Sequence, residues 1–438
     1  MKVRMYNVEF GESILLDGET ENLLVDFGSE KGDDTLLTKV ADDIMRESAG
    51  KCIYSMLSHF HKDHINGFLK TNLSQSVEIK KLFIPSVVEM DTKGGRISCA
   101  QIEVLKDIFE AIILQKKGSG SKNPEITLYS LLKKIMDTKS HVRSVHFLKR
   151  GDSFFFENSR YDVLWPDFDH IKLHGKTVKK VIKVSEWLGI VQKSDGKDDG
   201  AEEKKISFRL VDEFIGAIVE VYKELAAQEE SGDFSPESRE EQYRDLMNEA
   251  AEKYEKIVQL IQEKALVLDD DQITELQAVV RSIGNNQNRI SIVCHNIEAE
   301  DESRIMLTGD VENTDLELIV NNDPQLKVSM PIAERYAIIK APHHGTDTHY
   351  IPTLPQSKYI LTSNGGGNKA YHPIFHCYGG FYGANRGSIM KCTNRMDCTK
   401  YRCELYGLDA AGKGIRCPNC DDDQNEKKRN ADLYLDIS

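Results

Sequence analysis

The first sixty residues alternate between short apolar runs and polar turns. Residues 34–46 carry apolar side chains at helical spacing, and an apolar run at 52–57 predicts a buried strand. Ahead of them lie three shorter apolar runs separated by glycine turns, a pattern typical of antiparallel strands, at residues 2–9, 13–16 and 23–26. Because strand, loop and helix alternate, we predict an α/β core built in layers.

The middle of the chain follows a different pattern. Two stripes of apolar side chains recur there at helical spacing, one from 211 to 225 and one from 243 to 261. Such stripes indicate helices that pack against each other rather than a ligand groove. We therefore predict two halves of one core, a helical insertion between them and a cysteine-rich C-terminal extension. The first half of the core is expected at 1–169, the helical insertion at 170–285, the second half of the core at 286–375 and the C-terminal extension at 376–438.

Composition narrows the class of protein. The chain has 438 residues, a formal net charge of −14 and 40% hydrophobic residues, which predicts two or three folded units with packed interiors. The acidic charge argues against a protein that coats nucleic acid by bulk charge alone. No run approaches about 18 uninterrupted apolar residues, and the N-terminus lacks a signal-peptide pattern. We expect a cytoplasmic protein without a membrane span.

Residues 58–64, SHFHKDH, are the clearest chemical signal in the chain. His59 and His61 lie two residues apart, so in an extended loop both side chains point to the same side. Asp63 and His64 follow at a turn that can direct them to a second ion. Imidazole and carboxylate groups suit Zn²⁺, Mn²⁺ or iron, and two neighbouring ions can share a hydroxide nucleophile. The alternative is a histidine-rich surface loop without a metal.

Three later segments place polar side chains directly after predicted strands. Asp310 follows the apolar run IMLTG, His343 and His344 follow IIKAP, and His372 lies shortly after the strand that ends near Thr362. A Gly-Asp turn is common by itself, and paired histidines can be a structural turn. Because all three segments carry Asp or His at a strand end, we interpret them as completing the site that residues 58–64 begin.

These motifs, in this order, resemble the metallo-β-lactamase fold superfamily. Within it the chain is most similar to the hydrolase domain of the ComEC-type competence proteins. The likeness covers residues 1–170 and 286–375, and it implies an αββα sandwich. Its elements are an Asp after a strand at Asp26, HxHxDH at 59–64, N-x-x-S at 288–291, LTGD-x-E at 307–312, HHG at 343–345 and N-x-x-x-HP at 368–373.

The resemblance implies a role for each matched residue in a two-metal site. His59 and His61 would hold one metal, Asp63 and His64 the second, with His343 completing the second site and Asp310 bridging both. His344 would lie near a bound phosphate. Asp26 would support the metal loop by hydrogen bonding, and His372 would touch substrate or donate a proton to the leaving group.

One ligand of the superfamily is missing. Most members have a further histidine between the HxHxDH loop and the bridging aspartate, whereas this chain reads VLWP at 163–166, as ComEC-type domains also tend to. His170 is the nearest substitute, although a surface-loop histidine is the simpler interpretation. The first metal would therefore have fewer ligands than the second. A site poorer in imidazole also favours harder ions such as Mn²⁺ over Zn²⁺.

The C-terminal extension is a second candidate metal site. Five of the nine cysteines lie between Cys392 and Cys420, and the pair at 417 and 420 has the spacing of a zinc knuckle. A structural Zn²⁺ would be held by Cys398, Cys403, Cys417 and Cys420. Reduced cysteines without metal are the alternative. Residues 376–420 also carry a basic excess and several tyrosines, which could contact nucleic acid bases.

The sequence thus predicts a metal-dependent hydrolase, specifically a phosphodiesterase or nuclease that uses a metal-bound hydroxide. Its substrate would be nucleic acid or a small phosphodiester, and its cofactors two divalent ions, Zn²⁺ or Mn²⁺. One alternative is a hydrolase of small phosphodiesters, lactones or thioesters, which the acidic charge favours. Another is an effector subunit that uses the helical insertion to dock a partner protein.

Overall fold

A computed structural model describes most of the chain. The described residues are 1–30, 34–86, 97–171, 175–193, 206–227, 236–363, 389–393 and 432–437. They form a mixed α/β protein, as the alternating pattern predicts, divided into two compact units. Unit 1 comprises Met1–Pro85, His141–His170 and Asn288–Ser438, and unit 2 comprises Ser86–Ser140 and Ile171–Gln287.

Unit 1 contains two mixed sheets of seven strands each. In order, the first sheet consists of β16 (Leu433–Asp436), β1 (Lys2–Met5), β2 (Ser13–Asp17), β3 (Glu21–Phe27), β4 (Cys52–Met56), β5 (Ile79–Pro85) and β6 (Val142–Leu148). The second consists of β15 (Ile389–Cys392), β14 (Gln356–Thr362), β13 (Arg335–Lys340), β12 (Ile305–Leu307), β11 (Val293–His295), β8 (Ser159–Trp165) and β7 (Ser153–Phe156). In both sheets one half is antiparallel and the other is parallel, namely β3 to β6 and β12 to β15.

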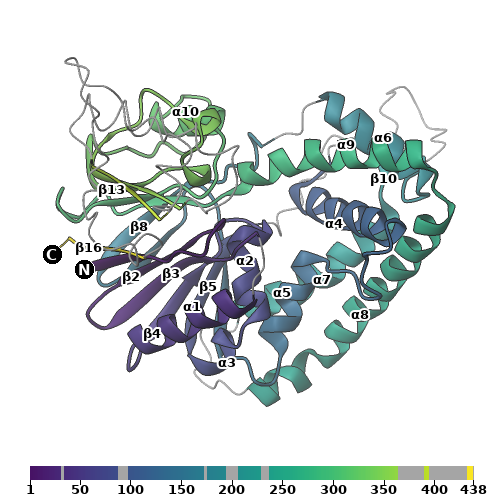
Figure 1. Cartoon of the computed structure of the whole chain (residues 1–438), viewed down its shortest axis with the longest axis horizontal. Coiled ribbons are helices and arrows are strands. Elements are labelled where there is room, and N and C mark those ends of the chain that lie inside the picture. The colour runs from purple at the N-terminus through teal and green to yellow at the C-terminus, as the bar shows by residue number, and fades with distance from the viewer. Residues whose placement is uncertain are drawn as a thin grey trace. The chain divides into compact units, whose positions relative to one another are not determined.

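The two sheets pack face to face through one apolar core. Strands β1 to β5 supply Met5, Leu16 and Met56 to this core, and the second sheet supplies Tyr161 and Leu307. A second apolar cluster lies on the other face of the first sheet, where helix α1 (Asp34–Glu47) covers β2 and β3 (Figure 1). Helices α2 (Lys62–Lys70), α3 (Leu73–Ser76) and α10 (Asn313–Val320) are the other α-helices described in this unit. It also has short 3-10 helices at Asn288–Ile290, His343–Gly345 and Asp347–His349.

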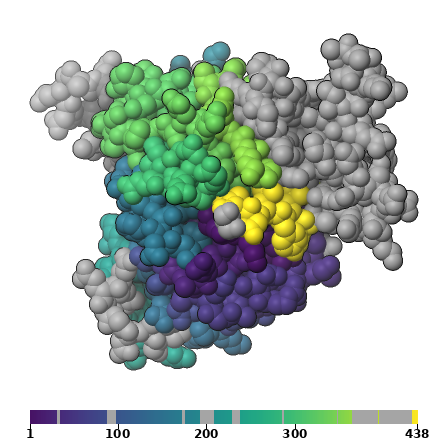
Figure 2. Space-filling view, turned by 90° about the vertical axis from the view of Figure 1, so that its left-hand side faces the viewer, coloured from purple at the N-terminus to yellow at the C-terminus, as the bar shows by residue number. Residues whose placement is uncertain are grey.

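The C-terminal strand is part of the core rather than of a separate extension. β16 pairs antiparallel with β1, from Lys2 opposite Asp436 to Met5 opposite Leu433, and Figure 2 shows this strand in yellow against the purple N-terminal segment. Arg4 donates to Asp432 just before the strand at 2.6 Å. β15 likewise joins the second sheet. The expected extension at 376–438 therefore contributes one strand to each sheet. The sequence pattern did not predict these strands because each has only four residues, too few for an alternation of apolar and polar residues to be recognised.

Unit 2 is built mainly of helices. Its elements are α4 (Cys99–Lys116), α5 (Thr127–Met136), α6 (Gly175–Trp187), α7 (Arg209–Ala227), α8 (Pro236–Val267) and α9 (Asp270–Gln287), with a two-stranded hairpin of β9 (Gln192–Lys193) and β10 (Ile206–Ser207). The unit joins the expected insertion at 170–285 to Ser86–Ser140, which the sequence pattern assigned to the core. The reason is that α4 is buried on most of its surface and packs against α7, α8 and α9 (Figure 1).

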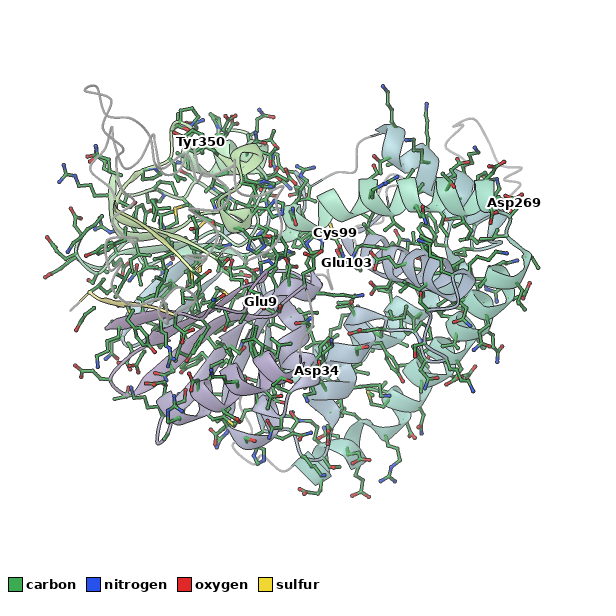
Figure 3. All side chains as sticks on the ribbon, viewed as in Figure 1. Glu9, Asp34, Cys99, Glu103, Asp269 and Tyr350 are labelled. Atoms are coloured by element: carbon green, nitrogen blue, oxygen red, sulfur yellow. The ribbon has the colours of Figure 1, made fainter. Side chains whose placement is uncertain are left out.

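The stripes expected at 211–225 and 243–261 lie on α7 and α8. All six apolar side chains of the first stripe are buried, as packing between helices requires. Glu103 on α4, labelled in Figure 3, accepts a hydrogen bond from Gln287 at the end of α9. Burial raises the pKa of Glu103 to about 8, although nearby Lys106 opposes the rise, so the helical interior favours the neutral acid. None of the helices in the described residues is long and apolar enough to cross a membrane.

Candidate metal centre

The carboxyl ends of the parallel strands bring the ligand-capable side chains of unit 1 together. In the first sheet, Asp26 lies near the end of β3 and residues 59–64 follow β4. In the second sheet, Asp310 follows β12, His344 follows β13 and Ser363 follows β14. Parallel strands place their carboxyl ends at one edge of a sheet, which is where α/β proteins usually bind ligands. Two such edges converge here.

The backbone of the HxHxDH segment changes direction at the centre. His61 is the extended residue before α2, so Asp63 and His64 lie in the first turn of that helix. The loop passes very close to Gly28, where a Cβ atom would lie 2.5 Å from the carbonyl carbon of Asp63 and from the nitrogen of His64. Only glycine permits this approach, so the close packing against Gly28 fixes the position of the backbone that carries Asp63 and His64.

Four side-chain atoms lie close to one another at the centre. Nε2 of His64 lies 3.1 Å from Oδ2 of Asp310 and 3.9 Å from Oδ2 of Asp63. Nε2 of His344 lies 3.2 Å from Oδ2 of Asp63 and 3.8 Å from Oδ2 of Asp310. Metal–ligand bonds of roughly 2.0–2.2 Å in a tetrahedron separate the ligand atoms by roughly 3.3–3.6 Å. The four imidazole–carboxylate distances scatter around that range, and the ligand atoms of Asp63, His64 and His344 all lie within 4.8 Å of one another, so these residues could hold a divalent ion with Asp310 beside them.

Hydrogen bonds on the far side of each imidazole orient its Nε2 towards the centre. Nδ1 of His64 lies 2.8 Å from Oδ2 of Asp26, which also accepts from the Ser58 hydroxyl at 2.7 Å. Nδ1 of His344 lies 3.0 Å from Oγ of Ser363. An imidazole that donates through Nδ1 carries its lone pair on Nε2, as a metal ligand requires. Both contacts favour a proton on Nδ1, so loss of the proton on Nε2 leaves each histidine in the tautomer needed for binding.

Replacing Asp26 with Asn should weaken metal binding while the fold persists. Asp26 accepts from the Ser58 nitrogen at 2.6 Å, from the Ser58 hydroxyl and from His64. The NH₂ group of an asparagine would face one of these donors and could not accept its hydrogen bond. We expect metal affinity about 10- to 100-fold lower, measured by titration calorimetry of the metal-free protein with Mn²⁺. Asp162→Asn, on β8 and paired with Arg160, is the control. Equal affinities for both variants would contradict this role.

A second group of ligands lies beside the first. Nε2 of His59 is 2.9 Å from Nδ1 of His61, and His59, His64 and Asp310 form another cluster of close ligand atoms. His170, the nearest substitute for the missing histidine, pairs with Asp167 at 3.2 Å and belongs to none of the ligand groups found in the described residues. These two groups share His64 and contain three ligand residues each, and a shortage of ligands on the His59 side stays a prediction.

The imidazoles and carboxylates of the centre shift one another's pKa values. Burial alone would lower the pKa of His64, but the carboxylates of Asp310, Asp26 and Asp63 raise it well above its usual value. The pKa of His344 is also raised, against burial, by Asp310 and Asp63. The positive imidazoles in turn hold the pKa of Asp63 and Asp310 below the usual range, although burial opposes this. Without a metal, protons on the histidines balance the carboxylates.

Metal binding should therefore strengthen as pH rises. His64 and His344 have raised folded-state pKa values, so their contribution to the stability of the metal-free protein is complete below the unfolded value of 6.5 and is lost as pH rises through the folded values. A metal must displace these protons. The stabilisation that Mn²⁺ provides should grow between about pH 6 and pH 8 by up to about 1.4 kcal/mol per pH unit for each proton. Denaturant unfolding with and without Mn²⁺ measures it, and a pH-independent increment would contradict the assignment.

The structure places His344, and not His343, in the set of four ligands. The expectation was the reverse, with His343 as ligand and His344 near phosphate. Both residues have positive φ, 46° and 57°, a conformation that non-glycine residues seldom adopt. The turn directs His344 inwards and His343 towards His349, whose ring nitrogen lies 3.0 Å away. Burial lowers the pKa of His343 to about 3, so this half-buried imidazole is neutral at the rim of the centre.

Sequence reasoning missed two charged residues at the centre. Glu12 and Lys340 are both buried and form an ion pair of 2.6 Å. Their only signal was a single charge within an apolar stretch, FGESILL and YAIIKAP, which is unusual for a buried strand. His372 and the four cysteines expected to bind structural zinc, Cys398, Cys403, Cys417 and Cys420, lie outside the described residues.

Comparisons with known proteins identify no relative: no family model, curated protein or solved structure matches this chain. The geometry of the centre and the chemistry of its residues are therefore the basis for assigning a function.

Proposed function

We propose that this chain is a metal-dependent hydrolase with the αββα arrangement of the metallo-β-lactamase superfamily, and that it cleaves phosphodiester bonds. One observation carries the proposal. Asp63 and His64 from one loop meet Asp310 and His344 from two others, and each imidazole Nε2 lies 3.1–3.9 Å from both carboxylates, distances at which a divalent ion could be held. Two imidazoles and two carboxylates can bind Zn²⁺ or Mn²⁺.

The residues around the centre orient its ligands before any metal binds. Ions held there would supply Lewis acidity towards a phosphoryl oxygen and an ionised water at neutral pH. Asp26 and Ser363 fix the tautomers of His64 and His344, so the ligands need little rearrangement. Asp26 is fully buried, whereas Asp63 and His61 keep some exposure. Substrate would therefore approach from the side of Asp63 and His61, where the neutral imidazole of His343 also lies.

The phosphodiester as substrate rests on the resemblance of the ordered motifs to ComEC-type domains. A nucleic acid is the polymeric form of this substrate, and the acidic net charge of −14 means that a local groove, not bulk attraction, would have to bind it. Small phosphodiesters, lactones and thioesters remain the alternative substrates. An effector subunit without turnover, docking a partner through the helical unit, is the alternative to an enzyme.

Turnover by metal-loaded protein tests the proposal. The protein is freed of metal with a chelator, loaded with Mn²⁺ or Zn²⁺, and assayed with bis(p-nitrophenyl) phosphate, an aryl lactone, and single- and double-stranded DNA and RNA. We expect hydrolysis of the phosphodiesters that depends on added metal. Hydrolysis of the lactone alone would contradict the phosphodiester substrate. Metal binding without any turnover would contradict the enzyme and support the effector subunit.

A further inference from the structure

A lysine lies at the centre of the buried carboxylates. Lys340 is the last residue of β13 and its side chain is 1% exposed. Its Nζ lies 2.6 Å from Oε2 of Glu12, 2.7 Å from the carbonyl oxygen of Gly309 and 3.2 Å from Oδ1 of Asp310. An ammonium has three N–H groups, and three acceptors surround it. The arrangement therefore suits the charged form, with each N–H given one partner.

Lys340 and the metal ligands use different oxygens of Asp310. Oδ1 faces the ammonium, while Oδ2 faces Nε2 of His64 at 3.1 Å and Nε2 of His344 at 3.8 Å. A free carboxylate on a short side chain can rotate about its terminal torsion, which has a broad energy profile. The contact with Lys340 restrains that rotation and leaves one oxygen for the ligand set.

The same ammonium is connected to the second imidazole of the set. Oε2 of Glu12 accepts from Lys340 and from the Ser363 hydroxyl at 2.9 Å. Oγ of Ser363 in turn lies 3.0 Å from Nδ1 of His344. A continuous path of hydrogen bonds thus runs from Asp310 through Lys340, Glu12 and Ser363 to His344. It joins two ligands that lie on different loops of the second sheet.

Stability alone is a poor explanation for this ion pair. Removing two charges from water costs several kcal/mol per ion, and apolar residues of similar volume are often as stable or more so. The backbone also shapes a place for the ammonium: Gly309 has φ of 51°, and a Cβ atom there would lie 2.8 Å from Cβ of Ser291. The turn that presents the Gly309 carbonyl to Lys340 thus requires glycine.

We propose that Lys340 is a positioning residue of the metal centre: its ammonium, paired with Glu12, restrains Asp310 so that only Oδ2 is offered to metal. The proposal rests on the metal-binding function proposed above. Losing the contact frees Asp310 to rotate, and the ion would then bind a poorly ordered ligand. Partners of this kind typically contribute 10- to 100-fold to metal affinity.

Metal titration of matched variants tests this role apart from activity. Lys340→Met keeps most of the length of the side chain and removes its charge. Glu12→Gln/Lys340→Met removes both charges, so no unpaired ion is buried if the single variant fails to fold. Lys358→Met is the control, because Lys358 is an exposed residue of β14. Each metal-free protein is titrated with Mn²⁺ by calorimetry, and its thermal unfolding is recorded.

We expect the double variant, and the single one where it folds, to bind Mn²⁺ about 10- to 100-fold more weakly than wild type. The double variant should unfold, without metal, within a few degrees of wild type, and the control should match wild type in both measurements. Wild-type affinity in the double variant would overturn the role of Lys340 and leave the metal centre intact. Absence of saturable binding in wild type would overturn the metal centre itself, and the role of Lys340 with it.

Discussion

Asp310→Ala is expected to abolish metal-dependent hydrolysis. Asp310, like Asp63, lies within 4 Å of both His64 and His344, and of these two carboxylates only Asp310 also belongs to the His59 cluster. Its loss removes a ligand from both sides of the centre at once. We expect kcat/KM for bis(p-nitrophenyl) phosphate to fall at least about 100- to 1,000-fold, the scale on which loss of a key electrostatic group acts. Bound Mn²⁺ per chain should fall with it.

Asp301→Ala is the matched control for this variant. Asp301 lies in the same unit, is 56% exposed and pairs with Arg304 on the surface, so removing its carboxylate should leave turnover and metal content unchanged. Circular dichroism checks that both variants are folded. Wild-type turnover by folded Asp310→Ala, with metal still bound, would contradict the assignment of Asp310 as a ligand.

His64→Ala is expected to have the second-largest effect, on stability as well as on metal. His64 is fully buried and belongs to all three ligand groups found in the described residues. In the metal-free protein, its raised pKa means that the imidazolium neutralises Asp310, Asp26 and Asp63. Removing one partner from a buried set of charges typically costs about 3–5 kcal/mol. We expect that loss in the free energy of unfolding near pH 6, measured by urea denaturation.

The control for His64 is His170→Ala. His170 pairs with Asp167 and lies outside the ligand groups of the described chain, so its variant should keep wild-type metal content. The effect of His64→Ala should also shrink as pH rises, because an imidazole that loses its proton no longer offsets the carboxylates. A His64→Ala variant as stable as wild type near pH 6 would contradict the charge balance proposed for the metal-free centre.

The ligand types and their strand ends were predictable, but the direction of each side chain was not. Asp310 and the HxHxDH segment each follow an apolar strand, so the sequence pattern alone places them after the carboxyl end of that strand. The two histidines at 343 and 344 differ only in how a turn with two positive φ values directs them. No local pattern predicts such a turn for non-glycine residues. Lys340 and Glu12 were missed because a charge at a strand end normally indicates exposure.

The division of the chain was predictable only where the pattern is local. The helical stripe of α7 predicted its buried face correctly, because helix packing is encoded within a few turns. The assignment of Ser86–Ser140 to unit 2 depends on α4 packing against helices more than ninety residues further on. The pairing of β16 with β1 joins opposite ends of the chain. Contacts at such separations are set by tertiary packing, which single-sequence patterns do not report.

Anomalous diffraction from crystals grown with Mn²⁺ tests the central claim most directly. Mn²⁺ is the suitable ion, because cysteines elsewhere in the chain favour softer metals. We predict an anomalous peak at about 2.0–2.3 Å from Nε2 of His64, Nε2 of His344 and the carboxylate oxygens of Asp63 and Asp310. A well-ordered centre without a peak at that point, in crystals saturated with Mn²⁺, would contradict the account.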